Sequence, residues 1–352
     1  MKIKVFDFFS GCGGTSTGFA RAGMEVVFGL DNDPDAAATF RANVKGATFI
    51  ENDIREVKTD VLAPLLRGKG YKTLFSCCAP CQPFSRQSRA KTKGDPRRSL
   101  LLEFGRFVRR WKPDYIFVEN VPGLQRVDGQ AGPLSEFTVL LSRIGYSFDI
   151  KVVPALAFGV PQKRERLILM AAKTGDLKIP SPTHGTARRP VSTVRDWIGG
   201  LPPLRAGEAD PSDPDHRAMA LSAINLKRIA ATPEGGGRGG WPESLRLDCH
   251  QRFDGHTDVY GRLAWDRPAA GLTTRCISYS NGRFGHPTED RAISVREAAC
   301  LQTFPRRYKF FGTLTSKAMQ VGNAVPPLMA RAIGRAFVKH ALDVCGRHHA
   351  DT

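Results

Sequence analysis

Short apolar segments alternate with segments of helical periodicity through the first half of the chain. Continuous apolar character or period-two alternation predicts β-strands, and apolar positions three or four residues apart predict helices. The predicted strands cover residues 3–8, 26–30, 48–50, 73–75, 115–118, 147–153 and 167–171. The predicted helices begin near Thr15 and cover residues 34–43, 57–66 and 100–111. This alternation favours an α/β fold with a doubly wound, mostly parallel sheet.

The pattern changes near Lys173. Residues 173–265 are rich in Pro, Gly and Asp and lack regular periodicity, which indicates a second, smaller and irregular domain. Regular patterns return from residue 266, and an amphipathic helix is predicted over residues 328–342. Because this helix has no sheet of its own to cover, we expect it to complete the first domain. The predicted organisation is therefore 1–172, 173–265 and a return segment, 266–352.

The composition narrows the class of protein. A chain of 352 residues with 41% apolar and 24% charged residues is typical of a soluble protein with room for two domains. It has no apolar run of about 18 residues, so we expect no membrane span. Its first residues predict a strand rather than a signal peptide. Eight cysteines without a compact disulfide framework indicate a reducing compartment, and we expect a cytoplasmic protein.

The net charge points to a polyanionic partner. The chain carries 52 Lys and Arg against 34 Asp and Glu, a formal charge of +18. Basic residues are concentrated between Arg86 and Lys112, where only Asp95 and Glu103 oppose them. A solvated charged loop would explain this stretch, but it also suits contact with phosphates.

A glycine-rich turn after the first strand indicates a ligand site. Residues 9–14 let the backbone approach a ligand closely, and the helix that follows offers free N–H groups. Asp31 ends the next strand about 20 residues later, where a doubly wound fold holds a ribose diol. No triphosphate-binding motif is present. A nucleoside-type cofactor without a long phosphate chain therefore fits best.

Cys81 is the candidate nucleophile. It follows the predicted strand 73–75 and the stiff residue Pro80, at the sheet edge where α/β proteins present their chemistry. A buried, inert cysteine is one alternative. Cys78 and Cys81 also form a C-x-x-C pair, so a dithiol centre is another. We expect no metal site, because zinc would need a second ligand pair that the sequence lacks.

A carboxyl and two guanidinium groups extend this candidate site. Glu119 follows the predicted strand 115–118, so it emerges from the same sheet edge as Cys81 and could act as a general acid. Arg164 and Arg166 are two residues apart and would share one face of an extended segment. Paired guanidinium groups favour recognition of an oxygen or a phosphate. A helix cap for Glu119 and surface ion pairs for the arginines are the alternatives.

Taken in order, these motifs resemble the DNA cytosine-5 methyltransferases of the bacterial modification-enzyme type. The likeness covers nearly the whole chain apart from about 173–265. It is carried by Asp7–Gly14, Pro80-Cys81-Gln82, Glu119-Asn120-Val121, Gln162-x-Arg164-x-Arg166 and Gly322-Asn323-Ala324-Val325.

The resemblance implies S-adenosylmethionine as the cofactor. Phe9 is expected to stack on its adenine, Asp31 to bind the ribose hydroxyls, and Asp53 with Ile54 to hold the adenine. The full set of expected cofactor residues is Phe9, Ser10, Gly11, Cys12, Gly13, Gly14, Asp31, Asn32, Asp53, Ile54, Pro80, Leu100, Asn323 and Ala324.

The resemblance also implies the catalytic groups and a double-stranded DNA substrate. Cys81 is the expected nucleophile, Glu119 contacts N3 and N4 of a flipped cytosine, and Arg166 contacts its O2, with Arg164 in the same catalytic set. Residues 82–98 are expected to close over the base, and 173–265 to form the target recognition domain. The expected DNA contacts are Gln82, Ser85, Arg86, Arg89, Arg97, Gln162, Thr273 and Thr274.

We therefore expect a monomeric, sequence-specific DNA cytosine-5 methyltransferase, within a restriction–modification system or acting alone. A tRNA cytosine-5 methyltransferase is the first alternative, because it shares the catalytic motifs. A non-catalytic binding protein is less consistent with intact Cys81, Glu119 and Arg166. A dithiol oxidoreductase would require Cys78 as well as Cys81.

Overall fold

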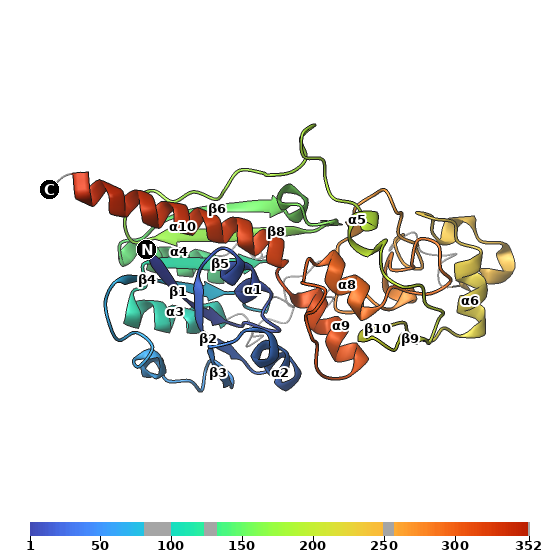
Figure 1. Ribbon diagram of the computed structural model, residues 1–352, viewed down its shortest axis with the longest axis horizontal. Helices are drawn as coiled ribbons and strands as arrows, with labels where there is room; N and C mark the ends of the chain where they lie inside the picture. Colours follow the sequence, from blue (N-terminus) through green and yellow to red (C-terminus); the bar gives the residue numbers. More distant parts are fainter. Residues whose placement is uncertain (81–99, 123–131, 249–256, 351–352) are drawn as a thin grey trace. The chain divides into compact units, whose positions relative to one another are not determined.

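The computed structural model describes residues 1–80, 100–122, 132–248 and 257–350. The chain divides into two compact units (Figure 1). Unit 1 comprises Met1–Pro154, Glu165–Pro182 and Val325–Thr352, and unit 2 comprises Ala155–Arg164 and Thr183–Ala324. The chain therefore passes between the units at four points.

Unit 1 is built on a seven-stranded sheet with the order β3-β2-β1-β4-β5-β8-β6. The first five of these strands pair in parallel, and β8 is antiparallel to both of its neighbours. The strands are β1 (Lys2–Phe8), β2 (Glu25–Asp31), β3 (Thr48–Glu51), β4 (Tyr71–Cys77), β5 (Tyr115–Asn120), β6 (Ser147–Pro154) and β8 (Glu165–Ala172). The prediction of a doubly wound, mostly parallel sheet is confirmed.

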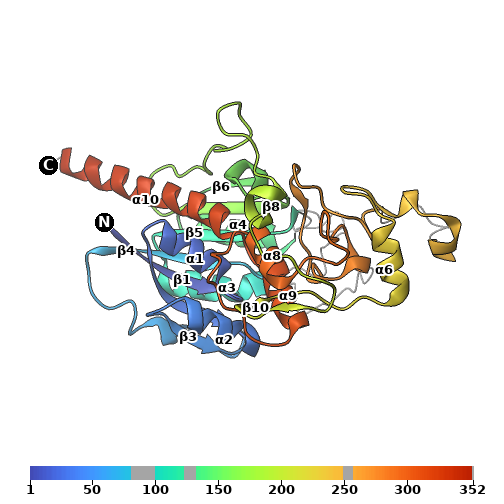
Figure 2. The same cartoon turned by 45° about the vertical axis from the view of Figure 1, so that its right-hand side comes forward.

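Helices cover both faces of this sheet. The helices of unit 1 are α1 (Gly14–Arg21), α2 (Pro34–Asn43), α3 (Leu100–Trp111), α4 (Pro133–Arg143) and α10 (Pro327–Ala350). On one face, α3 and α4 pack on Phe8 and its neighbours in the main core. On the other face, Phe19 of α1 stacks edge-on against Phe117 of β5 and Phe337 of α10. Figures 1 and 2 both show α10 lying along α1.

One predicted helix does not form. Instead of a helix over residues 57–66, the structure has a single 3-10 turn, η1 (Thr59–Leu62), followed by further turns. Pro64 is the physical reason, because its ring removes a backbone donor and would clash with the carbonyl of Asp60 inside a continuous helix. By contrast, α2 begins where the sequence predicts, with the Asp33 carboxylate accepting hydrogen bonds from the N–H groups of Asp35 and Ala36.

The centre of unit 1 contains a buried carboxylate, that of Asp7 on β1. Its Oδ2 accepts a hydrogen bond of 2.6 Å from Ser16 of α1, and its Oδ1 accepts one of 2.8 Å from Ser76 of β4. All three residues are fully buried. Asp7 therefore joins α1, the helix that follows the glycine turn, to β4, the strand that leads towards Cys81. Loss of solvation raises the pKa of Asp7 to about 6, although the two serine hydrogen bonds oppose this shift.

Unit 2 is built from short elements. Its helices are α5 (Val194–Ile198), α6 (Ala223–Ala230), α8 (Val295–Leu301) and α9 (Leu314–Asn323), with 3-10 turns η5 (Ala155–Phe158), η6 (Arg238–Gly240), η7 (Glu243–Leu245) and η8 (Tyr279–Asn281). Strand β9 (Ala209–Asp210) pairs antiparallel with β10 (Asp213–Arg217), and β7 (Gln162–Lys163) pairs in parallel with β11 (Ala269–Ala270).

Arginine side chains replace strand pairing in much of unit 2. The buried guanidinium of Arg262 donates to the carbonyls of Ile229, Thr232, His286 and Glu289. Arg283 donates in the same way to the carbonyls of Gly235, Gly236 and Arg262. Buried carbonyls must be hydrogen-bonded, and irregular backbone offers few N–H partners. These side chains supply the missing donors.

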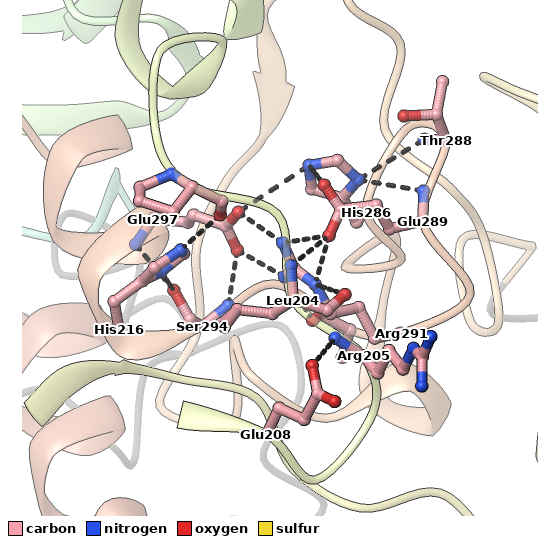
Figure 3. Close-up of polar contacts among 12 residues, drawn as sticks. Leu204, Arg205, Glu208, His216, His286, Thr288, Glu289, Arg291, Ser294 and Glu297 are labelled. Atoms are coloured by element: carbon pink, nitrogen blue, oxygen red, sulfur yellow. Dashed lines mark hydrogen bonds and ion pairs between the residues drawn. The ribbon is translucent and has the colours of Figure 1, made fainter. Parts of the chain in front are cut away.

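A buried ion pair holds the start of α8, as Figure 3 shows. Both guanidinium Nη atoms of Arg291 bind the carboxylate of Glu297, at 2.7 and 2.8 Å. The two side chains are 0% and 1% exposed. Glu297 also accepts a hydrogen bond from the N–H of Ser294, which caps the helix. The Ser294 hydroxyl contacts His216, so the network also holds the segment around β10.

We predict that Asp7 makes the stability of the protein depend on pH. Between pH 3.8 and about 6 the folded protein retains a proton that the unfolded chain has released. Stability should therefore fall as the pH rises through this window, by up to about 1.4 kcal/mol per pH unit. Asp7→Asn should lack this contribution. Urea unfolding of both proteins at several pH values checks the prediction, and identical pH dependence in the two would contradict it.

Candidate active site

Glu119 and Arg166 lie together at the end of β5. The Nε atom of Arg166 is 2.8 Å from Oε1 of Glu119, and their side chains are 17% and 8% exposed. The antiparallel pairing of β5 with β8 brings these residues together, because it sets Glu119 opposite Ile168 and so two residues from Arg166. The Arg166 Nη1 atom also donates to the carbonyl of Glu165. The nearly buried carboxyl group of Glu119 is thus held beside the guanidinium group of Arg166.

Asn120 links this pair to the segment before Cys81. Its side-chain Nδ2 donates to the carbonyl of Ala79 at 3.3 Å, and its Oδ1 accepts from the N–H of Val121 at 2.7 Å. The carboxyl ends of β4 and β5 are thereby joined by a side chain. Asn120 belongs to the Glu119-Asn120-Val121 motif, but the sequence predicts no function for it. Its contact with Ala79 joins two strands that meet only in the folded chain.

The predicted nucleophile itself lies outside the described residues. The same is true of the predicted DNA contacts Gln82, Ser85, Arg86, Arg89 and Arg97. The structure does describe Cys78, whose N–H donates to the carbonyl of Phe8 and whose sulfur lies 3.3 Å from the Thr15 hydroxyl. Burial raises the pKa of the Cys78 thiol well above its ordinary value, which keeps it neutral and unreactive.

A pocket opens beside the ends of β1, β2 and β3. Half of the expected cofactor residues line it: Phe9, Asp31, Asn32, Asp53, Ile54, Pro80 and Leu100. Leu30, Asn52 and Arg55 line it as well, and sequence reasoning assigned none of these. The parallel register explains the convergence, because each of these strands delivers the residue that follows it to the same edge.

Asp31 organises the glycine turn. Its Oδ2 accepts a hydrogen bond of 2.8 Å from the N–H of Gly11, and its Oδ1 accepts one of 3.0 Å from Asp33. Gly11 and Gly13 have φ values of 50° and 91°, a region that favours glycine. The turn thus forms because glycine supplies the backbone conformation and Asp31 supplies the acceptor. Burial raises the pKa of Asp31 above its ordinary value.

The remaining expected turn residues are largely internal. Ser10 is buried and its hydroxyl donates to the carbonyl of Leu30, while the Cys12 side chain packs in the interior. Burial raises the pKa of Cys12 to about 12. Gly14 begins α1, directly after the N-cap residue Gly13. Any ligand contact from this turn would therefore come mainly from its backbone.

The pocket residues fit an adenosine-like group. The carboxylates of Asp31 and Asp53 are acceptors suited to hydroxyl and amino groups. Phe9, Ile54 and Leu100 supply apolar surface for an aromatic base. Among the residues that the structure describes, no group of three or more His, Cys, Asp or Glu side chains could hold a metal ion.

Arg164 has different surroundings from Arg166. Its guanidinium lies in unit 2, is almost fully buried, and donates to the carbonyls of Leu272, Gly322 and Ala324 at 3.0 to 3.2 Å. Arg164 lies between β7 and β8, where its carbonyl accepts a hydrogen bond from the N–H of Ala155. These contacts give Arg164 a structural role, and its place in the expected catalytic set remains a prediction.

Gln162 is also internal to unit 2. It is fully buried, and its amide contacts the carbonyl of Leu301, the side chain of Gln302 and the N–H of Leu272. These contacts hold Gln162 in the interior of the unit, and its expected contact with DNA remains a prediction. The signal for burial was absent from the sequence, because a glutamine between Pro161 and Lys163 looks like a surface residue.

The remaining expected residues of unit 2 are Thr273, Thr274, Asn323 and Ala324. They flank the close approach of Gly322 to the Thr273 carbonyl. A side chain at Gly322 would come within 2.2 Å of the Thr273 carbonyl, so only glycine permits this approach. Thr273 and Thr274 are partly exposed, as is Ala324, while Asn323 at the end of α9 is exposed. These four residues are thus available for contacts outside the unit.

The family model for C-5 cytosine-specific DNA methylases matches residues 3–339. The chain belongs to this family. The chain is 42% identical over 339 residues to the type II methylase M.HgiDII of Herpetosiphon aurantiacus, covering 95% of this chain and 94% of that protein. It is 34% identical to the type II methyltransferase M1.HphI of Haemophilus parahaemolyticus, covering 96% and 87%. The recognised resemblance is confirmed.

Solved structures show the same fold. A prophage-encoded DNA modification methyltransferase of E. coli superposes with a TM-score of 0.74 at 23% identity, covering 96% of this chain and 99% of that one. The Dnmt2 methyltransferase of S. pombe gives 0.65 at 18% identity, covering 97% and 99%. Fold and family together imply S-adenosylmethionine as the methyl donor.

None of the described helices has the length and apolar character needed to cross a membrane.

We predict that Arg164→Met destabilises the protein by about 3 kcal/mol, because it leaves buried carbonyls without their donor. Arg275→Met is the matched control, since Arg275 is an exposed arginine of the same unit. The control should change the free energy of unfolding by less than about 0.5 kcal/mol. Urea unfolding measures both, and equal midpoints for the two variants would refute the structural role of Arg164.

Proposed function

We propose that this protein methylates C5 of a cytosine within a short sequence of double-stranded DNA. The observation that carries the proposal is the 2.8 Å pair of Glu119 and Arg166 at the sheet edge beside the Pro80 segment, in a chain of this family. Its named relatives are type II methyltransferases, which supports a restriction–modification role. We further propose that it acts as a monomer, because one flipped base needs one active site. We also propose that it acts in the cytoplasm.

In the proposed reaction, the thiolate of Cys81 adds to C6 of the cytosine. This addition breaks the aromaticity of the ring and makes C5 an enamine carbon, which divides one difficult step into easier ones. S-adenosylmethionine supplies an electrophilic methyl group when bound. The nucleophilic C5 takes this methyl group, and loss of the C5 proton to solvent with expulsion of the Cys81 thiolate then restores the aromatic ring in 5-methylcytosine.

Glu119 and Arg166 act on the opposite edge of the base. We assign Glu119 to N3 and N4, where a proton or a strong hydrogen bond stabilises the charge that develops during thiolate addition. We assign Arg166 to O2, where it orients the ring and adds electrostatic stabilisation. Because they already contact each other, little reorganisation is needed when the base arrives.

The cofactor residues follow from the pocket. We propose that Asp31 holds the ribose hydroxyls, Asp53 and Ile54 hold the adenine, and Phe9 stacks on it. Asn323 and Ala324 remain proposed contacts from unit 2. We propose the irregular segment 173–265 as the target recognition domain. The target base must leave the stack, at a cost of about a few kcal/mol, and phosphate contacts from the basic residues would offset this cost.

We predict that expression in a methylation-free bacterial host protects cytosines within one short sequence motif from bisulfite conversion. Cys81→Ala should abolish protection, because it removes the nucleophile. Cys78→Ala should retain it, since its raised pKa keeps that thiol protonated at neutral pH. Loss of transfer in Cys78→Ala would favour dithiol chemistry. If no genomic cytosine is protected, the same preparation tested on tRNA decides the RNA alternative.

We also predict that Glu119→Gln lowers kcat by about 10²–10⁴-fold, the usual contribution of a general acid. The KM for DNA should change much less, because glutamine retains hydrogen bonds to the base edge. Steady-state kinetics with a duplex oligonucleotide measures both. A rise in KM at constant kcat would show that Glu119 only binds the base.

A further inference from the structure

Arg55 lines the pocket beside Asp53, and no motif of the sequence assigns it a function. Its Nε donates to Oδ1 of Asp53 at 2.9 Å, and its Nη2 donates to Oδ2 at 2.5 Å. The backbone N–H of Arg55 also donates to Oδ1 at 2.9 Å. One residue therefore makes three hydrogen bonds to one carboxylate.

These bonds leave a specific acceptor site open. Each carboxylate oxygen can accept about two hydrogen bonds. Oδ1 accepts two from Arg55, whereas Oδ2 accepts one. Within the described part of the chain, one acceptor position on Oδ2 is thus still available, on a residue that faces the pocket.

Stability does not explain this ion pair. The Arg55 side chain is 46% exposed, and exposed ion pairs contribute roughly 0–1 kcal/mol. A two-point contact from a planar guanidinium instead fixes the direction of the carboxylate. The same contact lowers the pKa of Asp53, so the group remains an ionised acceptor at neutral pH.

A second arginine holds the same turn from the other side. Nη2 of Arg106 donates to the carbonyl of Ile54 at 2.8 Å, and its Nε contacts Glu103 at 2.6 Å. Arg106 and Glu103 belong to α3, whose first residue, Leu100, also lines the pocket. The turn that carries Asp53 and Ile54 is therefore anchored to α3.

We propose that Arg55 is a positioning residue that makes the pocket selective for adenine. It directs the open acceptor of Asp53 towards the exocyclic amino group of the cofactor's base. Hypoxanthine carries a carbonyl oxygen in place of that amino group, and an ionised acceptor repels it. The proposal rests on the proposed function, which places the adenosine part of the cofactor in this pocket.

Isothermal titration of the full chain with two ligands tests the proposal. The ligands are S-adenosylhomocysteine and its deaminated form, S-inosylhomocysteine. The natural protein should prefer the adenosyl ligand by roughly 10- to 100-fold, the range for a hydrogen bond to a charged group. Arg55→Ala should weaken the adenosyl ligand about tenfold and leave the inosyl ligand unchanged.

Three further variants separate orientation from other effects. Asp53→Ala should remove the preference, and adding Arg55→Ala to it should change neither affinity, because Arg55 then has no carboxylate to direct. Arg55→Lys keeps the charge without the paired donors and should lose most of the preference. Full preference in Arg55→Lys would overturn the proposal, as would an equal loss for both ligands in Arg55→Ala.

Arg41→Ala is the matched control. Arg41 forms a comparable exposed pair with Glu51, at 2.9 Å, in the same unit and outside the pocket. This variant should keep the natural affinities for both ligands. Failure of the natural protein to bind S-adenosylhomocysteine would count against the proposed function itself. Normal binding with an unchanged preference in Arg55→Ala would overturn only the role of Arg55.

Discussion

The parallel pairing of β1 with both β2 and β4 is the constraint on which the site depends. It sets Phe8 opposite Leu30 on one side and Cys77 on the other. The strand order reverses at this point, so the residues that follow these strands converge at one edge. A slip of one residue would turn every side chain of β1 to the opposite face. Asp7 opposes such a slip, because its two serine partners lie on α1 and β4.

Several of the protein's arginines serve the interior of unit 2. Arg164, Arg262, Arg291 and Arg296 are all buried in unit 2, where they bind carbonyls or carboxylates. Their charges are therefore part of the interior and do not form a surface for phosphates. Buried carboxylates, among them Asp7, Asp215 and Glu297, nearly balance these buried charges, so most of the formal charge of +18 is carried by other residues. Arginine suits this internal use because its planar guanidinium carries several donors in fixed directions.

The sequence predicts those features that depend on neighbours along the chain. The central strands, the cap of α2 and the glycine turn with Asp31 at the next strand end could be predicted because strand ends and glycine turns have local signatures. Tertiary contacts had no such signature. The burial of Gln162, the carbonyl partners of Arg164 and the link from Asn120 to Ala79 depend on segments that meet only in the folded chain. The predicted helix over 57–66 failed for a local reason, the ring of Pro64.

The hydrogen bonds of Arg164, Arg262 and Arg283 to backbone carbonyls have an evolutionary consequence. A carbonyl is present in every amino acid, so partners such as Leu272 and Thr232 can be replaced by mutation while each bond persists, whereas Gly322 is held to glycine by its contact with Thr273. The frame of unit 2 is thus insulated from the identity of most of its residues. If the segment 173–265 reads the target, as proposed, a lineage can acquire a new recognition sequence through surface substitutions alone. The sheet and the Glu119–Arg166 pair would be inherited without change.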